Sequence, residues 1–321
     1  MAATLAPEAQ GILGSSLHGR RKLANRAATT AMIFAFVIAA LPLAHVVFTV
    51  FSKGYHALTV DWFTKDITAN IGQLSSQDKI NSSFAGGTAT VSTGTIVLGM
   101  KPAIIGTLLI TALASLLAIP LGVLGAIYLN EYGKKGRLAS VIRFMTDVMT
   151  GVPSVVMGLF IFTAYVIPNG INGLSAIAGA LALACLMLPI VIRSTEEMLR
   201  LVPNSLREAS AALGTRTWRT TLGVVVPAAL PGITSGCMLA VARAAGETAP
   251  LLFTIGAVTA TNLSLHGFNT ALSMQIYANA NEHTPEQTLM AWGAALTLIA
   301  IVLLLTIIAR FITSRFSIRS S

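Results

Sequence analysis

Two oppositely charged residues, Arg243 and Glu247, interrupt a long stretch of apolar and small residues. Residues four apart lie on one face of a helix, so these two side chains can approach each other. A charged side chain in the middle of a membrane costs about 2.5–3.5 kcal/mol, and such residues are expected to have a role. The guanidinium of Arg243 offers parallel N–H donors that suit an oxyanion. The pair is either a structural ion pair or part of a path for an anion.

The composition of the chain indicates a membrane protein in contact with lipid. Of the 321 residues, 54% are hydrophobic and 10% are charged, whereas soluble domains contain about 25% charged residues. The net charge is +9, but the basic residues are scattered between apolar stretches, which argues against a nucleic-acid partner. The cysteines, Cys185 and Cys237, show neither metal-binding nor disulfide spacing, so no metal is expected.

Six apolar stretches are each long enough to cross a membrane as a helix. The fold class is therefore predicted to be all-α, a polytopic membrane protein with six transmembrane helices. Prolines within these stretches, such as Pro153, are expected to kink the helices. The transmembrane domain is predicted over residues 29–311, between tails at 1–28 and 312–321, with spans at 29–51, 103–129, 144–167, 173–192, 231–257 and 288–308.

The distribution of basic residues predicts the orientation of the chain. With the N-terminus in the cytoplasm, sixteen of the 21 Lys and Arg residues lie in cytoplasmic segments and four lie outside. The positive-inside rule favours this arrangement, which also puts the C-terminus in the cytoplasm. Residues 193–228 then form a cytoplasmic loop. Residues 52–102 form a long outer segment, which is either a partly ordered loop or a docking surface.

The cytoplasmic loop contains signals for two short helices. Ser205 and Glu208 have the spacing of a capping box, which predicts a helix over residues 206–213. Gly214 is expected to end that helix, and Thr215 is expected to cap a second short helix. Glu208 is either only a capping residue or part of a surface that binds another protein.

The run EASAALG at residues 208–214, followed by Pro227 and Pro231, resembles the EAA loop of ABC-transporter permeases. It departs from the family at Ser210, where alanine is most common. The resemblance implies that Glu208, Ala209 and Gly214 couple the chain to a separate ATPase. The chain has no G-x-x-x-x-G-K-[S/T] phosphate loop. It is therefore expected to be non-catalytic and without a cofactor, with ATP bound by a partner subunit.

The run ARAAGETAPLLFT at residues 242–254 is similar to the signature of phosphate ABC permeases of the PstA type. Residues 126–132, 146–162 and 186–203 resemble the same family. The resemblance implies an ABC importer type I permease fold in the bacterial plasma (inner) membrane. It also implies a heterodimer with a PstC-type permease, two ATPase subunits and an external phosphate-binding protein. The substrate path is expected to contain Arg243 and Glu247.

Arg193 is a further candidate for the anion path, or else a positive-inside anchor at a span end. Other functions stay open. The chain could be a permease subunit for another oxyanion, such as sulfate or molybdate, or an ion-coupled carrier. An ion-coupled carrier would need charged residues within its spans, but it has no use for an EAA-like loop.

Overall fold

The computed structural model describes residues 17–67, 98–133, 136–282 and 284–316. All regular elements in these ranges are helices. The chain divides into two compact units, Met1–Ser52 and Lys53–Ser321, each of which is described by itself. Most of the predicted outer segment, residues 68–97, lies outside the described residues, as do most of the two predicted tails.

The first unit contains most of α1 (Leu17–Gly54), a helix of 38 residues that includes Pro42. The helix begins well before the span predicted at 29–51, since residues 17–28 are also helical. Its apolar part is long enough to cross a membrane.

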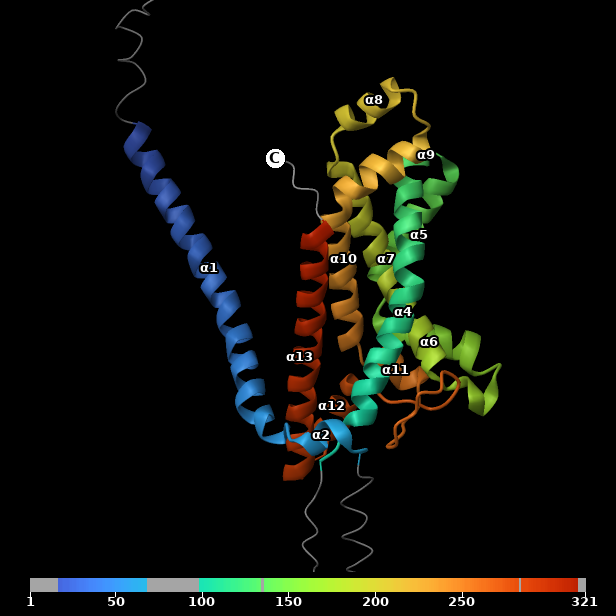
Figure 1. Cartoon of the computed structure of the whole chain (residues 1–321). Helices are drawn as coiled ribbons and strands as arrows, with labels where there is room; N and C mark the ends of the chain where they lie inside the picture. The colour runs from blue at the N-terminus through green and yellow to red at the C-terminus, as the bar shows by residue number, and fades with distance from the viewer. Residues whose placement is uncertain (1–16, 68–97, 134–135, 283, 317–321) are drawn as a thin grey trace, which may run out of the picture. The chain divides into compact units, whose positions relative to one another are not determined.

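Four long helices form the frame of the second unit: α4 (Lys101–Ile127), α7 (Ala176–Leu201), α10 (Val226–Gly246) and α13 (Pro285–Phe316). In Figure 1 they run side by side between the end that carries α8 (Asn204–Ala212) and the end that carries α12 (Leu272–Ala280). A buried cluster joins α4, α7 and α10 and includes Ile110, Ala114, Leu183, Met187 and Ile233. Alanines are frequent in this cluster, and small residues allow helices to approach closely.

Two helices joined by a sharp bend form a further candidate membrane span. Helices α5 (Arg137–Gly151) and α6 (Ser154–Ile161) are bent by 109° at Val152 and Pro153. Pro153 lacks an N–H donor, and the residue before a proline disfavours helical angles. The predicted span at 144–167 therefore contains an elbow and a π-helical turn at Phe162–Val166. Within the described residues, five helices are long and apolar enough to cross a membrane, or six spans result if the bent pair counts as one.

The predicted span at 231–257 is also divided. Helix α10 ends at Gly246, and a separate short helix, α11 (Ala249–Thr254), follows. Glycine weakens a helix, and Pro250 is favoured in the first turn of a new helix. Helix α6 packs against α11, where Gly158 faces the backbone of Pro250. The frame therefore has helix breaks at two places within predicted spans.

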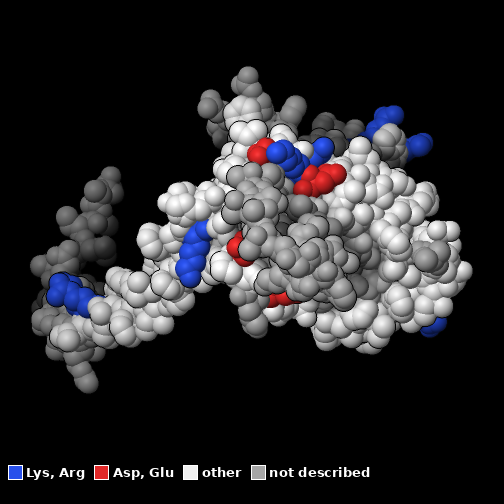
Figure 2. Space-filling model, turned by 90° about the horizontal axis from the view of Figure 1, so that it is seen from below, with Lys and Arg blue, Asp and Glu red and all other residues white. Residues whose placement is uncertain are grey.

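The α12 end is closed by short elements: α2 (Val60–Thr64) and α12 (Leu272–Ala280). Trp62 is fully buried there and donates a hydrogen bond from Nε1 to Thr297 Oγ1 at 3.0 Å. A hydrogen bond from Thr261 to the exposed carboxylate of Asp66 lowers the pKa of Asp66. Seen from this end, most of the described surface carries no charged side chain (Figure 2).

Candidate substrate path and coupling loop

Arg243 and Glu247 lie at the break between α10 and α11. Arg243 is in the last turn of α10, and Glu247 follows the helix with non-helical angles, φ −72° and ψ 129°. The interpretation that both residues lie within one continuous helix is therefore wrong, because the helix stops at Gly246. The positive charge of Arg243 is favourable at this C-terminal helix end.

The two side chains nevertheless meet. Arg243 Nε lies 3.5 Å from Glu247 Oε1, a long ion pair in which the side chains are 68% and 19% exposed, respectively. The backbone of Glu247 is held on both sides, since its N–H donates to Ala244 O at 3.2 Å and its carbonyl accepts from Ser273 Oγ at 3.0 Å. The backbone of Glu247 is thus held in place beside Arg243, while the guanidinium keeps much of its donor surface open.

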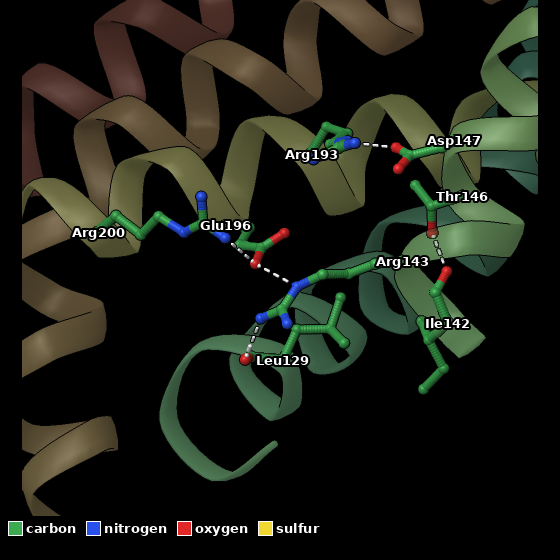
Figure 3. A network of polar contacts seen from close by, with 8 residues as sticks. All are labelled: Leu129, Ile142, Arg143, Thr146, Asp147, Arg193, Glu196 and Arg200. Atoms are coloured by element: carbon green, nitrogen blue, oxygen red, sulfur yellow. Dashed lines mark hydrogen bonds and ion pairs between the residues drawn. The ribbon is translucent and has the colours of Figure 1, made fainter. Parts of the chain in front are cut away.

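Arg193 lies on a different helix and has a different partner. Its guanidinium, on α7, pairs with Asp147 on α5 (Figure 3), and both side chains are about half exposed. Within the described ranges, the ion pair of Arg193 with Asp147 is separate from the ion pair of Arg243 with Glu247. An anion at Arg193 would compete with the carboxylate of Asp147.

In the predicted cytoplasmic loop α8 (Asn204–Ala212) is a separate short helix, whereas α9 (Thr217–Thr220) continues through a π-helical turn, Thr221–Val225, into α10. The predicted capping box of Ser205 and Glu208 is wrong, because Pro203 occupies the N-cap position and no side chain caps the helix. The fixed φ of proline suits a residue at the start of a helix. The helix begins directly after Pro203, at Asn204, so Ser205 already lies within it.

The predicted glycine stop is confirmed. Gly214 has φ +72°, and its N–H donates to Ala211 O at 2.9 Å. Only glycine adopts this conformation without strain, as is common after a helix.

Thr215 does not cap the second helix, as was predicted, because Arg216 is the N-cap residue of α9 and makes no side-chain cap bond. Instead the Thr215 hydroxyl donates to Ser210 O at 2.7 Å. It also bonds to the hydroxyls of Ser210 and Thr220, at 2.7 and 2.9 Å. Thr215 therefore joins the end of α8 to α9.

The three residues predicted to couple to an ATPase are all accessible. Glu208, Ala209 and Gly214 are exposed, as are the large apolar side chains of Leu213 and Trp218, the former 84% exposed. Helix α8 buries none of its residues. This arrangement leaves a polar helix and two apolar side chains free to contact another protein.

Sequence reasoning missed two buried ion-pair groups beside this loop. Glu196 on α7 is 2% exposed and contacts Arg143 at 3.0 Å and Arg200 at 2.6 Å. Figure 3 shows the two arginines reaching Glu196 from α5 and α7. The second group is the pair of Glu131 and Arg207 at 2.9 Å. Only the four-residue spacing of Glu196 and Arg200 is a signal visible in the sequence.

Known proteins resemble the chain over most of its length. Residues 118–318 match the family described as binding-protein-dependent transport system inner membrane component. A phosphate transport system permease protein PstA 1 from Mycobacterium tuberculosis is 42% identical, over 92% of this chain and 91% of that protein. The phosphate transport system permease protein PstA of Pasteurella multocida is 36% identical, over 90% and 94%.

A solved structure supports the fold. A chain from the inward-facing MetNI methionine ABC transporter aligns with a TM-score of 0.55, over 67% of this chain and 95% of that chain, at 20% identity. This likeness concerns the fold alone, and with the helix bounds above it confirms the predicted all-α ABC importer permease fold of type I. The chain is therefore a member of the binding-protein-dependent inner membrane permease family and belongs to its PstA-type phosphate permeases.

Proposed function

We propose that this chain is the transmembrane permease subunit of an ATP-driven importer of inorganic phosphate, in which it forms half of the translocation path. Family membership supports a transport role, and the names of relatives that match nine-tenths of the chain, as phosphate transport permeases, support phosphate as the substrate. The structural observation that carries the proposal is the exposure of the Arg243 side chain, which is 68% exposed although it pairs with Glu247.

The geometry at Arg243 suits transient binding of an oxyanion. A guanidinium keeps its charge at all physiological pH values and presents N–H groups in a planar fork. The ion pair with Glu247 is long, at 3.5 Å, so an anion can displace the carboxylate at little cost. Arg193 is a secondary candidate for the same path, since Asp147 already occupies its guanidinium.

Coupling to ATP hydrolysis is assigned to the loop that carries α8 and α9. In this proposal Glu208, Ala209 and Gly214 face a separate ATPase subunit, which binds and hydrolyses ATP, while this chain is non-catalytic. The exposure of all three residues supports that contact. The complete transporter would contain a PstC-type second permease, two ATPase subunits and an external phosphate-binding protein.

The proposed location is the bacterial plasma membrane, with both termini and the α8 end in the cytoplasm. Sixteen of the 21 basic residues fall on that side, as the positive-inside rule requires. Membership of a family of inner membrane components supports this location.

The test is uptake of radiolabelled phosphate by proteoliposomes that hold the complete complex and enclose ATP. We expect ATP-dependent uptake that excess sulfate or molybdate does not inhibit. Arg243→Gln should reduce uptake at least about tenfold, because it removes a charged donor of the kind that contributes roughly 1.5–3 kcal/mol per hydrogen bond. Arg310→Gln is the control, since it removes an exposed basic side chain from α13, outside the proposed anion path and coupling loop.

Each outcome bears on a different part of the proposal. Inhibition by sulfate or molybdate would identify a permease for another oxyanion. Uptake driven by an ion gradient without ATP would identify an ion-coupled carrier. Undiminished uptake with Arg243→Gln would make the Arg243–Glu247 pair structural.

A further inference from the structure

Helix α8 has no apolar anchor on the rest of the protein. None of its nine residues is buried, so hydrophobic packing contributes little to its position. Its described side-chain hydrogen bonds to other elements come from two residues, Arg207 near its start and Ser210 near its end. Apart from the chain connections at Pro203 and at residues 213–216, these side-chain contacts are the described route by which α8 can transmit force to the membrane domain.

Arg207 makes several of these contacts at once. Its Nη2 donates to Glu131 Oε1 at 2.9 Å, and its Nε lies 3.4 Å from Oε2 of the same carboxylate. It also donates to the carbonyls of Leu199 at 2.9 Å and Val202 at 2.7 Å. The side chains of Arg207 and Glu131 are only 17% and 6% exposed. This planar fork fixes direction as well as distance, which a flexible ammonium group cannot do.

The acceptors belong to the ends of two long helices. Glu131 lies in the π-helical turn Tyr128–Tyr132, which continues α4. Leu199 is in the last turn of α7, and Val202 is its C-cap. The last carbonyls of a helix have no partner within the helix, so Arg207 satisfies groups that would otherwise need water or another donor.

A second ionic contact connects the same helix ends to α5. Arg143 on α5 bonds to Glu196 on α7 and donates from Nη2 to Leu129 O, in the turn that follows α4, at 2.8 Å (Figure 3). The ends of α4, α5 and α7 are thus fixed to one another independently of Arg207. Arg207 alone connects this assembly to the start of α8 among the contacts described above.

We infer that Arg207 and Glu131 are positioning residues that make α8 move as one body with the ends of α4 and α7. The inference rests on the proposed function, in which an ATPase contacts α8. A displacement of α8 then reaches α4 and α7 together, through the Arg207 fork. Without the fork, the ATPase still docks on the exposed surface of α8, but its motion reaches α7 only through the chain at Pro203 and is no longer delivered directly to the end of α4.

The first measurement compares ATP hydrolysis with phosphate uptake in the reconstituted complex. With Arg207→Gln or Glu131→Gln, we expect the number of ATP molecules hydrolysed per phosphate imported to rise at least about tenfold, while subunit assembly is unchanged. The double variant should be no worse than either single variant, because both remove the same interaction. Arg207→Lys keeps the charge but loses the fork, and should be intermediate. Arg310→Gln, which removes an exposed basic side chain from α13, should leave the ratio unchanged.

A merely structural role would give a different result. If hydrolysis and uptake fall in parallel, or if Arg207→Gln keeps the native ratio, the inference is overturned. Reduced assembly of the complex together with an unchanged ratio in the assembled fraction would also contradict it. Failure of the unsubstituted complex to import phosphate would contradict the proposed function instead.

The second measurement does not depend on the substrate. Spin labels are placed at Ser205→Cys on α8 and Leu124→Cys on α4, both exposed, in a chain with Cys185→Ala and Cys237→Ala. The distance between the labels in the full complex is compared without nucleotide and after trapping with ATP and vanadate. With native Arg207, we expect the distance between the labels to be the same in the two states. With Arg207→Gln added, we expect the distance in the vanadate-trapped state to differ from that in the nucleotide-free state. A distance that already changes with the native Arg207 would rule out movement as one body.

Discussion

At the level of single residues, the negative charge of Glu247 is expected to affect which anion binds to Arg243. The two groups are 3.5 Å apart, so an anion that binds the guanidinium comes close to a negative charge. Two unit charges about 4 Å apart repel by roughly 1–4 kcal/mol, depending on exposure to water. Phosphate keeps a proton near neutral pH and can donate a hydrogen bond to the carboxylate, whereas sulfate is fully ionised.

Glu247→Gln should therefore weaken the preference for phosphate. We expect the sulfate concentration that halves phosphate uptake to fall about tenfold, which corresponds to ~1.4 kcal/mol. The measurement is a competition series in proteoliposomes, with Glu247→Asp as the control that keeps the charge. An unchanged preference would remove Glu247 from anion selection.

Gly214 permits a second prediction at this scale. Its φ of +72° costs any residue with a Cβ atom about 1–2 kcal/mol, although nothing lies within 4 Å of an added methyl group. Gly214→Ala should therefore shift the elbow between α8 and α9 and weaken binding of the ATPase by roughly tenfold, measured by titration of the purified subunit. Gly223→Ala is a matched control, since it also has open space and no positive φ. Equal affinities for the two variants would show that the elbow conformation does not matter for docking.

At the level of elements, the contact between α6 and α11 sets the position of both short helices. A Cβ atom on Gly158 would lie 2.5 Å from the Cα atom of Pro250, which is backbone and cannot move aside. Gly158→Ala should force the helices apart and destabilise the protein by about 1–3 kcal/mol. The expected observation is a lower Tm in detergent than that of Gly151→Ala, because Gly151 has no neighbour within 4 Å. Equal Tm values would mean that α6 and α11 do not pack closely.

The sequence predicted the long elements well and their interruptions poorly. Apolar length alone indicated α4, α7 and α13, because a membrane span needs about 20 apolar residues. The kink at Pro153 was expected, but its 109° angle depends on how α6 packs against α11. The end of α10 at Gly246 was missed, because small residues around Arg243 are compatible with either a helix or a break.

The sequence likewise predicted some residues of the candidate site and missed others. Arg243 and Glu247 were found because charges are conspicuous in apolar sequence, and Gly214 because a glycine that follows a helix has a local signature. Glu131 and Arg207 were missed because 76 positions separate them. Only the folded chain brings the end of α4 beside α8, and no local pattern reports such a contact.

At the level of the whole molecule, successive membrane-spanning helices alternate in direction, and this determines which helix ends lie on the same side of the membrane. In the second unit α4, α7 and α13 run toward the α8 end, whereas α10 and the bent pair α5–α6 run away from it (Figure 1). The bent pair must then count as one crossing, despite its 109° elbow. Two positions on opposite sides of this pair, Ser140 and Pro168, are both exposed and suit a direct test.

Single cysteines at four exposed positions should react in two groups. In spheroplasts of cells with Cys185→Ala and Cys237→Ala, a membrane-impermeant maleimide should label Pro168→Cys and Ala260→Cys from outside. Ser140→Cys and Ser205→Cys should react only after permeabilisation, because the positive-inside rule predicts that the α8 end lies in the cytoplasm. The opposite pattern would invert the chain. Labelling of Ser140→Cys and Pro168→Cys from the same side would show that the elbow returns to its own side, and that the second unit crosses the membrane four times rather than five.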